Sequence, residues 1–540
     1  MTQTLAPSTA VALIKDDPRG LRATGAFDRF DRPFAGDAKP GDLVEVTTGR
    51  HAEPVRRFGR PSSVHAVIAA LAEHAGERPF TAEHEHLAAQ AAATSDRFDR
   101  RDLRALPTFT IDGDSTRDFD DALSARREGD AIRVWVHVAD VSAYVRPGAP
   151  LDLEARRRAT SFYLPTLTVP MLPKALSTGV CSLVPGEDRG AVTCEVLLRD
   201  GQVVDRAFYR SLIRSDARLT YTHVEDIFLG RAEPGPTYAA ALAAARQAAI
   251  DRTAEAAERG NEPVFEITDG EVTGIQQRPE QESQRLIERL MVLANQEVAR
   301  FLRRRAAPTL YRTHSAGDDD RMQRLVARLV SLGVTVNDPS VDGVAAAVDE
   351  HEKAFGPNET LRGLLRGVRP PAAYQREPAA HEGLGIGSYC HFTSPIRRYA
   401  DLIVHRALLA ELDAEPLNTA PRHVHLDTLA EHLNERTRAA KKLERRAIDI
   451  CRVSLLRHRL RTGALERSLT GVISGMSAHG CYVTVDCAEG LLSGRDLGGD
   501  PNEPLTIWQT PARELRIGEQ VRVRIRTVDP VRGQLRLALA

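Results

Sequence analysis

The stretch Thr110-Ile-Asp-Gly-Asp-Ser-Thr-Arg-Asp-Phe-Asp-Asp121 places five aspartates within ten residues. Carboxylates at this density repel one another, so some of them stay protonated unless a cation lies among them. A hard divalent ion with oxygen ligands would relieve the repulsion. Apolar residues flank the aspartates, from Phe109 on one side to Leu123 on the other, and they predict that the loop is partly buried. The stretch therefore predicts an acidic loop that is a candidate metal site.

Closely spaced aspartates also occur in calcium loops of the EF-hand kind and in solvated acidic turns. An EF-hand loop has aspartates at its first, third and seventh positions, and Asp112, Asp114 and Asp118 would provide them. Such a loop also needs glycine at its sixth position and glutamate at its twelfth, where this chain has Arg117 and Leu123. These two mismatches exclude the calcium loop, whereas a solvated acidic turn remains the alternative.

Length and composition constrain the rest of the chain. At 540 residues the chain is long enough for more than one domain, and its hydrophobic content of 42% suffices for a sizeable core. The formal net charge is −1, so nucleic-acid binding would depend on local basic patches. The six cysteines include no CxxC pair, which predicts free thiols in a reducing compartment. Without a signal pattern or a long apolar run, the sequence predicts a cytoplasmic monomer that does not span a membrane.

Four stretches of the chain follow one another in an order that a known family shares. They are the acidic stretch itself, Tyr163-Leu-Pro with Pro170-Met-Leu-Pro173 and Cys181-Ser-Leu183, Ile287-Glu-Arg-Leu-Met-Val-Leu-Ala-Asn295, and Tyr389-Cys-His-Phe-Thr-Ser-Pro-Ile-Arg-Arg-Tyr-Ala-Asp401. Together they resemble the ribonuclease II family, which carries the RNB catalytic domain. The resemblance runs from about Leu103 to about Leu460. Four separate motifs in one order argue against chance similarity.

The resemblance implies functions for individual residues. Asp112, Asp118, Asp120 and Asp121 match the family's four catalytic aspartates, which would also hold Mg²⁺, with Mn²⁺ able to substitute. Arg397 matches an arginine that grips the phosphate near the cut, and its planar fork suits a bidentate phosphate contact. The residues expected to contact RNA, two of them in the C-terminal region, are Tyr163, Tyr311, Arg397, Glu444, His479 and Tyr482.

The resemblance also separates the roles of these RNA-contacting residues. Tyr163 matches an aromatic residue that stacks on the bases at the 3′ end, and stacking tolerates any base. Glu444 matches a glutamate that lines the 3′-nucleotide pocket, and Tyr311 lies near the place of a second stacking ring. Arg398, next to Arg397, is expected to be structural and to pair with an acid.

Residues 1–100 are expected to form a small N-terminal domain that departs from the family. Family members carry two five-stranded cold-shock barrels ahead of the aspartates, and the residues available here are too few for both. Residues 1–40 lack periodicity and are expected to be irregular, whereas apolar spacing predicts a helix over Val64–Ala75 and a second helix after Thr81. A helix pair with a short strand pair favours an α/β domain of the winged helix-turn-helix type. Such a domain would contact RNA or DNA, or serve only as scaffolding.

Residues 101–462 are expected to form the RNB catalytic domain, with strands first and helices later. Thr108–Ile111 is predicted to be a strand, whereas Glu282–Arg304 has leucines at helical spacing and Leu426–Leu460 continues the helical bias. This order predicts an α+β fold rather than a doubly wound sheet. The segment Arg436–Arg461 carries ten Lys or Arg residues against two acids. It indicates either a solvated helix face or an electropositive wall for a phosphate backbone.

Residues 463–540 are expected to form an S1 domain, which is an OB-fold β-barrel that binds single-stranded RNA. Five short stretches of strand character with glycines between them support this interpretation. His479 and Tyr482 would stack on bases, while the alternating Arg522, Arg524 and Arg526 would face phosphates. The alternative places Tyr482 in the core of the barrel.

The resemblance implies a Mg²⁺-dependent exoribonuclease. Such an enzyme hydrolyses single-stranded RNA processively from the 3′ end and releases nucleoside 5′-monophosphates. One alternative is a catalytically inactive relative that only binds RNA, although all four aspartates and Arg397 are present. Another alternative is a nucleic-acid-binding regulator that uses the N-terminal helices.

Overall fold

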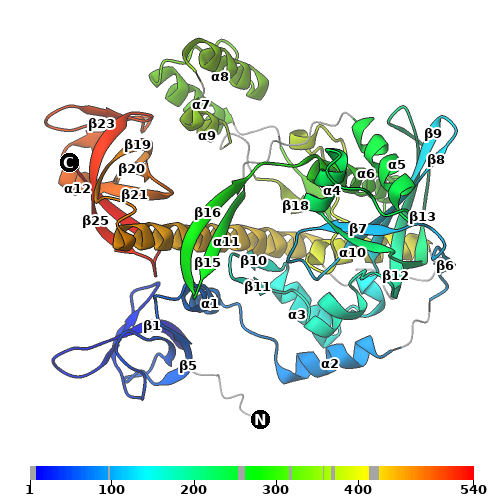
Figure 1. The fold of residues 1–540 in the computed structure, drawn as a ribbon, viewed down its shortest axis with the longest axis horizontal. Coiled ribbons are helices and arrows are strands. Elements are labelled where there is room, and N and C mark those ends of the chain that lie inside the picture. The colour runs from blue at the N-terminus through cyan, green and yellow to red at the C-terminus, as the bar shows by residue number, and fades with distance from the viewer. Residues whose placement is uncertain are drawn as a thin grey trace.

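The computed structural model describes residues 8–94, 98–252, 262–315, 319–356, 358–366, 371–412 and 425–540. A long helix, α11 (Leu426–Thr462), runs from a β-barrel at one end of the molecule to a large mixed sheet with its helices at the other (Figure 1). The N-terminal sheet lies below the barrel end of this helix in that view. None of the helices in the described ranges combines the length and apolar character needed to cross a membrane.

The N-terminal region contains a five-stranded antiparallel sheet where the sequence predicted irregular chain and a short strand pair. Its strands are β1 (Thr9–Lys15), β2 (Arg22–Gly25), β3 (Asp31–Pro33), β4 (Leu43–Thr47) and β5 (Pro54–Gly59), in the order β3-β2-β1-β4-β5. The described part of the stretch predicted to be irregular therefore forms three strands, while residues 1–7 lie outside the described residues. Residues 8–94 hold one such sheet, in agreement with the expectation that two barrels do not fit.

The two predicted N-terminal helices form but do not pack against each other. Helix α1 (Val64–His74) packs on β1, β4 and α11, and it buries the predicted apolar face there. Helix α2 (Ala82–Ala92) instead contacts α3 (Pro150–Arg158) and the helical turn η2 (Ala175–Val180). A helix-turn-helix needs its two helices against one another. The winged helix-turn-helix prediction is therefore wrong, because α1 and α2 bury their apolar faces on different parts of the molecule.

A seven-stranded mixed sheet carries the acidic stretch. Its strands follow the order β14-β7-β8-β9-β12-β13-β6, so that β7 and β8 are neighbours. The bounds are β6 (Arg101–Asp102), β7 (Phe109–Asp112), β8 (Asp121–Glu128), β9 (Ala131–Ala139), β12 (Asp188–Arg199), β13 (Gln202–Arg214) and β14 (Ala217–Thr220). The aspartates thus lie at the end of β7, at the start of β8 and in the loop between them. The predicted strand Thr108–Ile111 is confirmed as β7, shifted by one residue.

Helices cover both faces of this sheet. On one face, α5 (Ala239–Ile250), α6 (Glu282–Arg304) and part of α10 (Tyr399–Leu412) form a core with Phe109, Val134 and Val136. On the other face, α3, η1 (Val141–Ala143), η2 and the start of α11 surround Trp135. The sheet is mixed, and a helical core covers each of its two faces. This arrangement confirms the predicted α+β class.

Smaller elements bridge the gap between the sheet and the barrel. The hairpin of β15 (Glu262–Thr268) and β16 (Glu271–Arg278) crosses α11, and α4 (Tyr221–Phe228) packs on α6 (Figure 1). The remaining elements before α10 are β10 (Phe162–Leu164) with β11 (Leu167–Val169), β17 (Tyr311–Thr313) with β18 (Ala373–Gln375), α7 (Asp319–Ser331), α8 (Val341–Phe355), α9 (Glu359–Arg366) and η3 (Glu382–Leu384). Helices α7 to α9 share a small core and meet the barrel through Arg328, whose Nε donates to the Pro504 carbonyl at 3.0 Å.

The C-terminal region closes into a five-stranded barrel, as expected for an OB-type fold. Its strands are β19 (Ser468–Ser477), β20 (Gly480–Val485), β21 (Ala488–Ser493), β25 (Gln520–Asp529) and β26 (Gln534–Leu539), with α12 (Gly494–Leu497), β22 (Asp500–Pro501), β23 (Ile507–Gln509) and β24 (Glu514–Arg516) inserted. Val453 and Leu456 of α11 pack into the barrel core. At Gly533, which has φ +64°, a Cβ would lie 3.0 Å from the Ile450 nitrogen, so the barrel approaches the helix at backbone distance there.

Candidate active site

Two side chains from other parts of the chain, Ser182 and Arg218, hold the backbone of the acidic loop in place. Ser182, in one of the four motif stretches, accepts from the Phe119 backbone N–H at 3.0 Å and donates to the Arg117 carbonyl at 2.9 Å. Arg218 of β14 donates to the carbonyls of Gly113 and Asp114 at 2.5 and 3.0 Å. Sequence reasoning assigned no role to either side chain. Ser182 could have been found from its motif, whereas nothing in the local sequence indicates Arg218.

Asp120 joins the acidic loop to the motif around Arg397. Its side chain is 4% exposed, and its Oδ1 accepts from the Ile396 backbone N–H at 2.7 Å. Its Oδ2 lies 3.4 Å from Nε of Arg397. Burial raises the pKa of Asp120 well above its usual value, and the nearby charge of Arg397 opposes this rise. Two motifs that are 276 residues apart thus meet at one carboxylate.

Asp112 and Asp121 form a second pair of carboxylates beside Asp120. Desolvation raises the pKa of both, and the charge of Asp121 raises that of Asp112 further. Without a cation, this environment favours the protonated acids. Asp112 Oδ2 and Asp120 Oδ2 are both buried and lack a hydrogen-bond partner among the described residues. Buried carboxylate oxygens with unused lone pairs fit a hard divalent cation such as Mg²⁺.

The carboxylates are close together in the sequence, but their side chains are not arranged as a metal coordination sphere. In the described ranges, no three acidic, histidine or cysteine side chains converge as a group that could hold a metal. Asp118 is engaged with Tyr163, whose hydroxyl donates to Asp118 Oδ2 at 2.8 Å. This hydrogen bond leaves the other carboxylate oxygen of Asp118 available as a ligand.

Arg397 and Arg398 point to different partners. The side chain of Arg397 is 42% exposed and lies beside Asp120. Its Nη2 donates to Ser394 Oγ at 2.9 Å. Arg398 makes two hydrogen bonds to Asp401, at 2.8 and 2.9 Å. The expected pairing of Arg398 with an acid is therefore present, and Arg397 keeps a guanidinium surface available next to the acidic loop.

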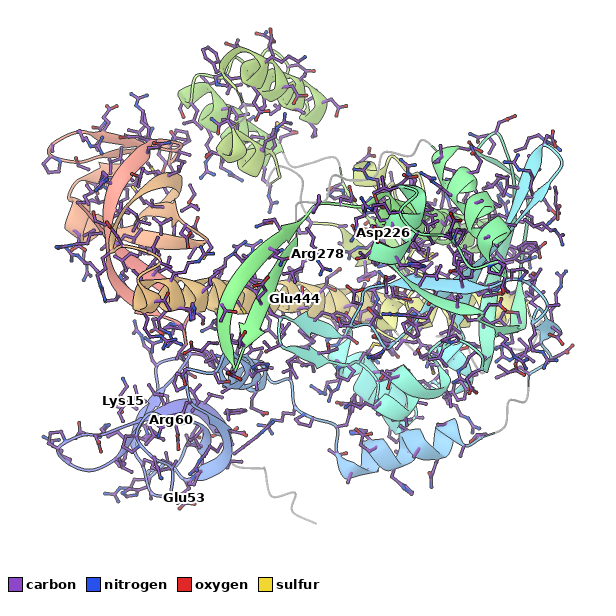
Figure 2. The ribbon with its side chains drawn as sticks, viewed as in Figure 1. Lys15, Glu53, Arg60, Asp226, Arg278 and Glu444 are labelled. Carbon is purple, nitrogen blue, oxygen red and sulfur yellow. The ribbon has the colours of Figure 1, made fainter. Side chains whose placement is uncertain are left out.

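Tyr163 lies at the rim of the same loop. It belongs to β10, it is 43% exposed, and its ring is therefore available for stacking. Its backbone N–H hydrogen-bonds to Glu444 of α11, and this bond opposes the rise that partial burial produces in the pKa of Glu444. Tyr163 and Glu444 thus adjoin each other, and Tyr163 connects them to Asp118 (Glu444 is labelled in Figure 2).

Tyr311 has a different environment from Tyr163. It is 3% exposed, lies on β17 and packs in the core that covers the large sheet. Burial raises its pKa to about 12. The structure leaves this ring no free face for a base, which differs from the expected stacking role. The reason is tertiary: the ring lies in the core that α6 and the large sheet form.

The basic segment of α11 divides into two groups. Several of its arginines form structural contacts: Arg436 with Glu77, Arg459 with Asp486, and Arg461 with Glu271. By contrast, four basic residues near Glu444 in the sequence are exposed, and they are Arg438, Lys441, Lys442 and Arg445. These four could form an electropositive wall for a phosphate backbone.

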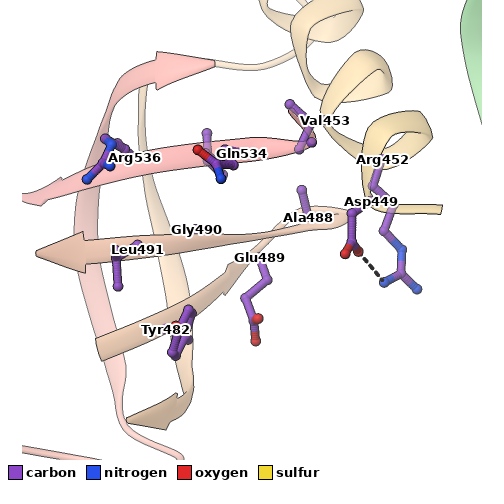
Figure 3. Close-up of a pocket in the computed structure, with 12 residues that line it drawn as sticks. Asp449, Arg452, Val453, Tyr482, Ala488, Glu489, Gly490, Leu491, Gln534 and Arg536 are labelled. Carbon is purple, nitrogen blue, oxygen red and sulfur yellow. Dashed lines mark ion pairs between the residues drawn. The ribbon is translucent and has the colours of Figure 1, made fainter. Parts of the chain in front are cut away.

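The barrel residues expected to bind RNA are placed as follows. His479 is exposed in the turn between β19 and β20. Tyr482 is half-buried and lines a pocket of about 260 Å³ together with Asp449 and Arg452 of α11 and Arg536 (Figure 3). Tyr482 is therefore neither a fully exposed platform nor a core residue. Arg522, Arg524 and Arg526 alternate outward along β25.

Similarity to known proteins agrees with this geometry. A sequence model of the RNB domain matches residues 100–414, which is more than half of the chain. The chain belongs to the RNB domain family. Ribonuclease R of Escherichia coli is 31% identical over 96% of this chain, but the chain spans only 64% of the length of that relative.

Solved structures with this fold include both an RNA-bound ribonuclease and an inactive relative. The Mycoplasma genitalium RNase R complex with ribose-methylated single-stranded RNA matches with a TM-score of 0.86 at 22% identity, over 99% of this chain and 90% of the other. Yeast Ssd1, described as a pseudonuclease, matches with a TM-score of 0.65 at 17% identity, over 94% of this chain and 68% of the other. Because the RNB fold occurs in both, activity has to be argued from the site.

Proposed function

We propose that this RNB-family chain is a metal-dependent exoribonuclease. It would hydrolyse single-stranded RNA processively from the 3′ end and release nucleoside 5′-monophosphates. The observation that carries the proposal is the meeting of the acidic loop with Arg397 through Asp120, next to the exposed Tyr163. The named relatives, among them Ribonuclease R of Escherichia coli, favour the same activity.

Each residue at the site has a task in this proposal. Arg397 would bind the phosphate to be cut, because a guanidinium matches two phosphate oxygens at once. Tyr163 would stack on a base at the 3′ end, while Glu444 would position the same nucleotide. Asp112, Asp118, Asp120 and Asp121 would hold Mg²⁺, which when bound supplies charge neutralisation and activates water.

The alternatives are weaker on structural grounds. A pseudonuclease shares the fold, which keeps a catalytically inactive relative as an alternative, but this chain retains all four aspartates and Arg397. A regulator that reads nucleic acid with the N-terminal helices loses its basis, because α1 is packed between the N-terminal sheet and α11. The nuclease is therefore the proposal to test first.

A labelled-RNA assay tests the proposed activity. With Mg²⁺ present, a 5′-labelled single-stranded RNA should shorten from its 3′ end, and the released product should co-migrate with nucleoside 5′-monophosphates. EDTA should stop the reaction, and added Mg²⁺ or Mn²⁺ should restore it. Retention of full-length RNA by a protein that binds it tightly would favour the inactive relative, and shortening from the 5′ end would contradict the proposed polarity.

Tyr163→Ala is expected to weaken RNA binding by about 1–3 kcal/mol, the usual contribution of one stacked base. Tyr163→Phe is the matched control, since it keeps the ring and removes only the hydroxyl that donates to Asp118. Titration of single-stranded RNA by fluorescence anisotropy measures both. Equal affinities for Tyr163→Ala and the wild type would show that no base stacks on this ring.

Replacement of Arg522 and Arg524 by Gln is expected to weaken RNA binding and to reduce its salt dependence. Each phosphate contact on single strands contributes about 0.7 to the slope of log K against log salt, so the double variant should lose up to about 1.4. Arg513 and Arg516, which are exposed but paired with Glu519 and Glu514, provide the control double variant. An unchanged slope in the Arg522/Arg524 variant would remove this strand from the RNA path.

A further inference from the structure

A second opening reaches the acidic loop from a side that Tyr163 and Arg397 do not line. It is a pocket of about 210 Å³ whose lining includes Asp112 and Asp114 of the loop. Tyr221 of α4, Arg278 at the end of β16, and Gln281 and Gln284 at the start of α6 complete it. Tyr163, Arg397 and Glu444 are not among its described lining residues. Asp112 and Asp114 therefore connect this pocket to the acidic loop.

Processive cleavage from an end creates a need for such a second opening. After each cut, the shortened RNA still occupies the path that leads past Tyr163 and α11. The released nucleotide cannot return through that path unless the RNA dissociates first. An enzyme that stays on its RNA must therefore release its product elsewhere.

The chemistry of the pocket suits a single nucleotide. Its volume of about 210 Å³ is below the ~300–1,000 Å³ that is usual for drug-sized ligands, so the pocket would enclose only part of a nucleoside monophosphate and would not hold an oligonucleotide. Tyr221, Val264 and Pro279 offer apolar surface to a base, while the Gln281 and Gln284 amides offer hydrogen bonds. Arg278, which is labelled in Figure 2, supplies a positive charge for a phosphate.

Arg278 is held only loosely in the present arrangement. It pairs with Asp114 at 3.5 Å, and both side chains are 58% exposed. Exposed ion pairs contribute little to stability, so a phosphate dianion can compete for the guanidinium. The acids that also line the pocket, Asp112, Asp114 and Glu280, would keep the affinity for a phosphate low. Low affinity is what release of a product requires.

We propose that this pocket is the exit site for the nucleoside 5′-monophosphate, with Arg278 as its phosphate contact. The proposal rests on the proposed function and adds the route by which the product leaves. It separates the RNA-holding face of the acidic loop from a product-holding face behind Asp112 and Asp114.

A kinetic experiment tests the exit role with a variant that narrows the pocket. Thr222→Trp places an indole at an exposed lining position of α4, and Thr222→Ser is the control of similar size. Time courses in which each enzyme molecule degrades one 5′-labelled RNA give the rate of the first cut and the rate of later cuts. We expect the ratio of later to first rate to fall about tenfold in Thr222→Trp and to stay at the wild-type value in Thr222→Ser. An unchanged ratio in Thr222→Trp would overturn the exit role.

A binding experiment tests the pocket without cleavage. Asp120→Asn protein is saturated with single-stranded RNA in Mg²⁺, and AMP is then titrated by calorimetry. AMP is expected to bind without displacing the RNA, and Arg278→Ala in this background should weaken it about fivefold, with Arg278→Lys retaining most of the affinity. Arg231→Ala is the control, because it breaks another exposed pair, with Asp226 at 2.7 Å, and neither residue is among those described as lining the pocket (Asp226 is labelled in Figure 2).

The outcomes separate the two proposals. AMP that displaces RNA, fails to bind the RNA complex, or binds Arg278→Ala as tightly as the parent would overturn the exit site even if the wild type degrades RNA. Conversely, a wild type that releases no mononucleotides would end the proposed function, and Arg278-dependent binding of AMP to the RNA complex would still identify a nucleotide site.

Discussion

Asp120→Asn is expected to lower kcat by about two decades or more, which corresponds to roughly 3 kcal/mol of lost transition-state stabilisation. Asn keeps an oxygen that can accept from the Ile396 backbone N–H, so the local fold should persist. The variant loses the negative charge that faces Arg397 and that cation binding at the loop depends on. RNA binding should remain, because removal of one carboxylate reduces repulsion of the phosphate backbone.

The measurement for Asp120→Asn pairs an RNA-binding curve with single-turnover cleavage at saturating RNA. Asp130→Asn serves as the control, since Asp130 makes an exposed pair with Arg199 at 2.9 Å at the far end of the same sheet. Near-normal cleavage by Asp120→Asn would show that this carboxylate is not part of the catalytic centre. The acidic stretch would then have to be something other than a metal site.

Asp401→Ala is expected to lower the free energy of unfolding by about 3–5 kcal/mol, the usual cost of removing one partner from a buried ion pair. Asp401 is fully buried, receives both hydrogen bonds from Arg398, and accepts from the Ser394 backbone N–H at 2.8 Å. The variant would leave the Arg398 charge without its carboxylate. Cleavage should fall as well, because Ser394 also supports Arg397.

Urea unfolding of Asp401→Ala and of Asp226→Ala measures this effect against a surface reference. The Asp226–Arg231 pair is exposed, and such pairs contribute about 0–1 kcal/mol. Replacement of both Arg398 and Asp401 by apolar residues should recover part of the lost stability, because no charge is then stranded. If the loss in Asp401→Ala were no larger than in Asp226→Ala, Asp401 would not hold this motif together.

The parts of the fold that were predicted well are those with a strong local pattern. Helix α6 begins and ends at the predicted residues, because leucines at helical spacing continue through it. Helix α11 also begins at its predicted start. The barrel strands alternate sharply, and Arg522 and Arg524 face outward as expected. In these segments the local sequence is enough to specify the helix or the strand.

The parts that were missed depend on distant partners. The local pattern of strand β1 is weak because alanines stand among its apolar residues. The strand pairs with the distant β4, and Leu13 lies opposite Leu43. Tyr311 is buried because distant residues of α6 and of the large sheet form a core around it. In the same way, the pocket behind Asp112 includes Arg278 from a hairpin that is far away in the sequence. The composition of a segment and the spacing of its residues do not indicate such contacts with distant segments.

Helix α11 also acts as a rigid spacer within the molecule. Glu444, beside Tyr163, and Val453, in the barrel core, lie nine positions apart on one unbroken helix, roughly 14 Å along its axis. One residue inserted between them would rotate the barrel by about 100° relative to Tyr163 and Glu444, whereas seven would restore the facing and lengthen the span by about 10 Å. If the barrel and the site bind RNA as proposed, the length of RNA between them would change in discrete steps with the number of helical residues that separate them.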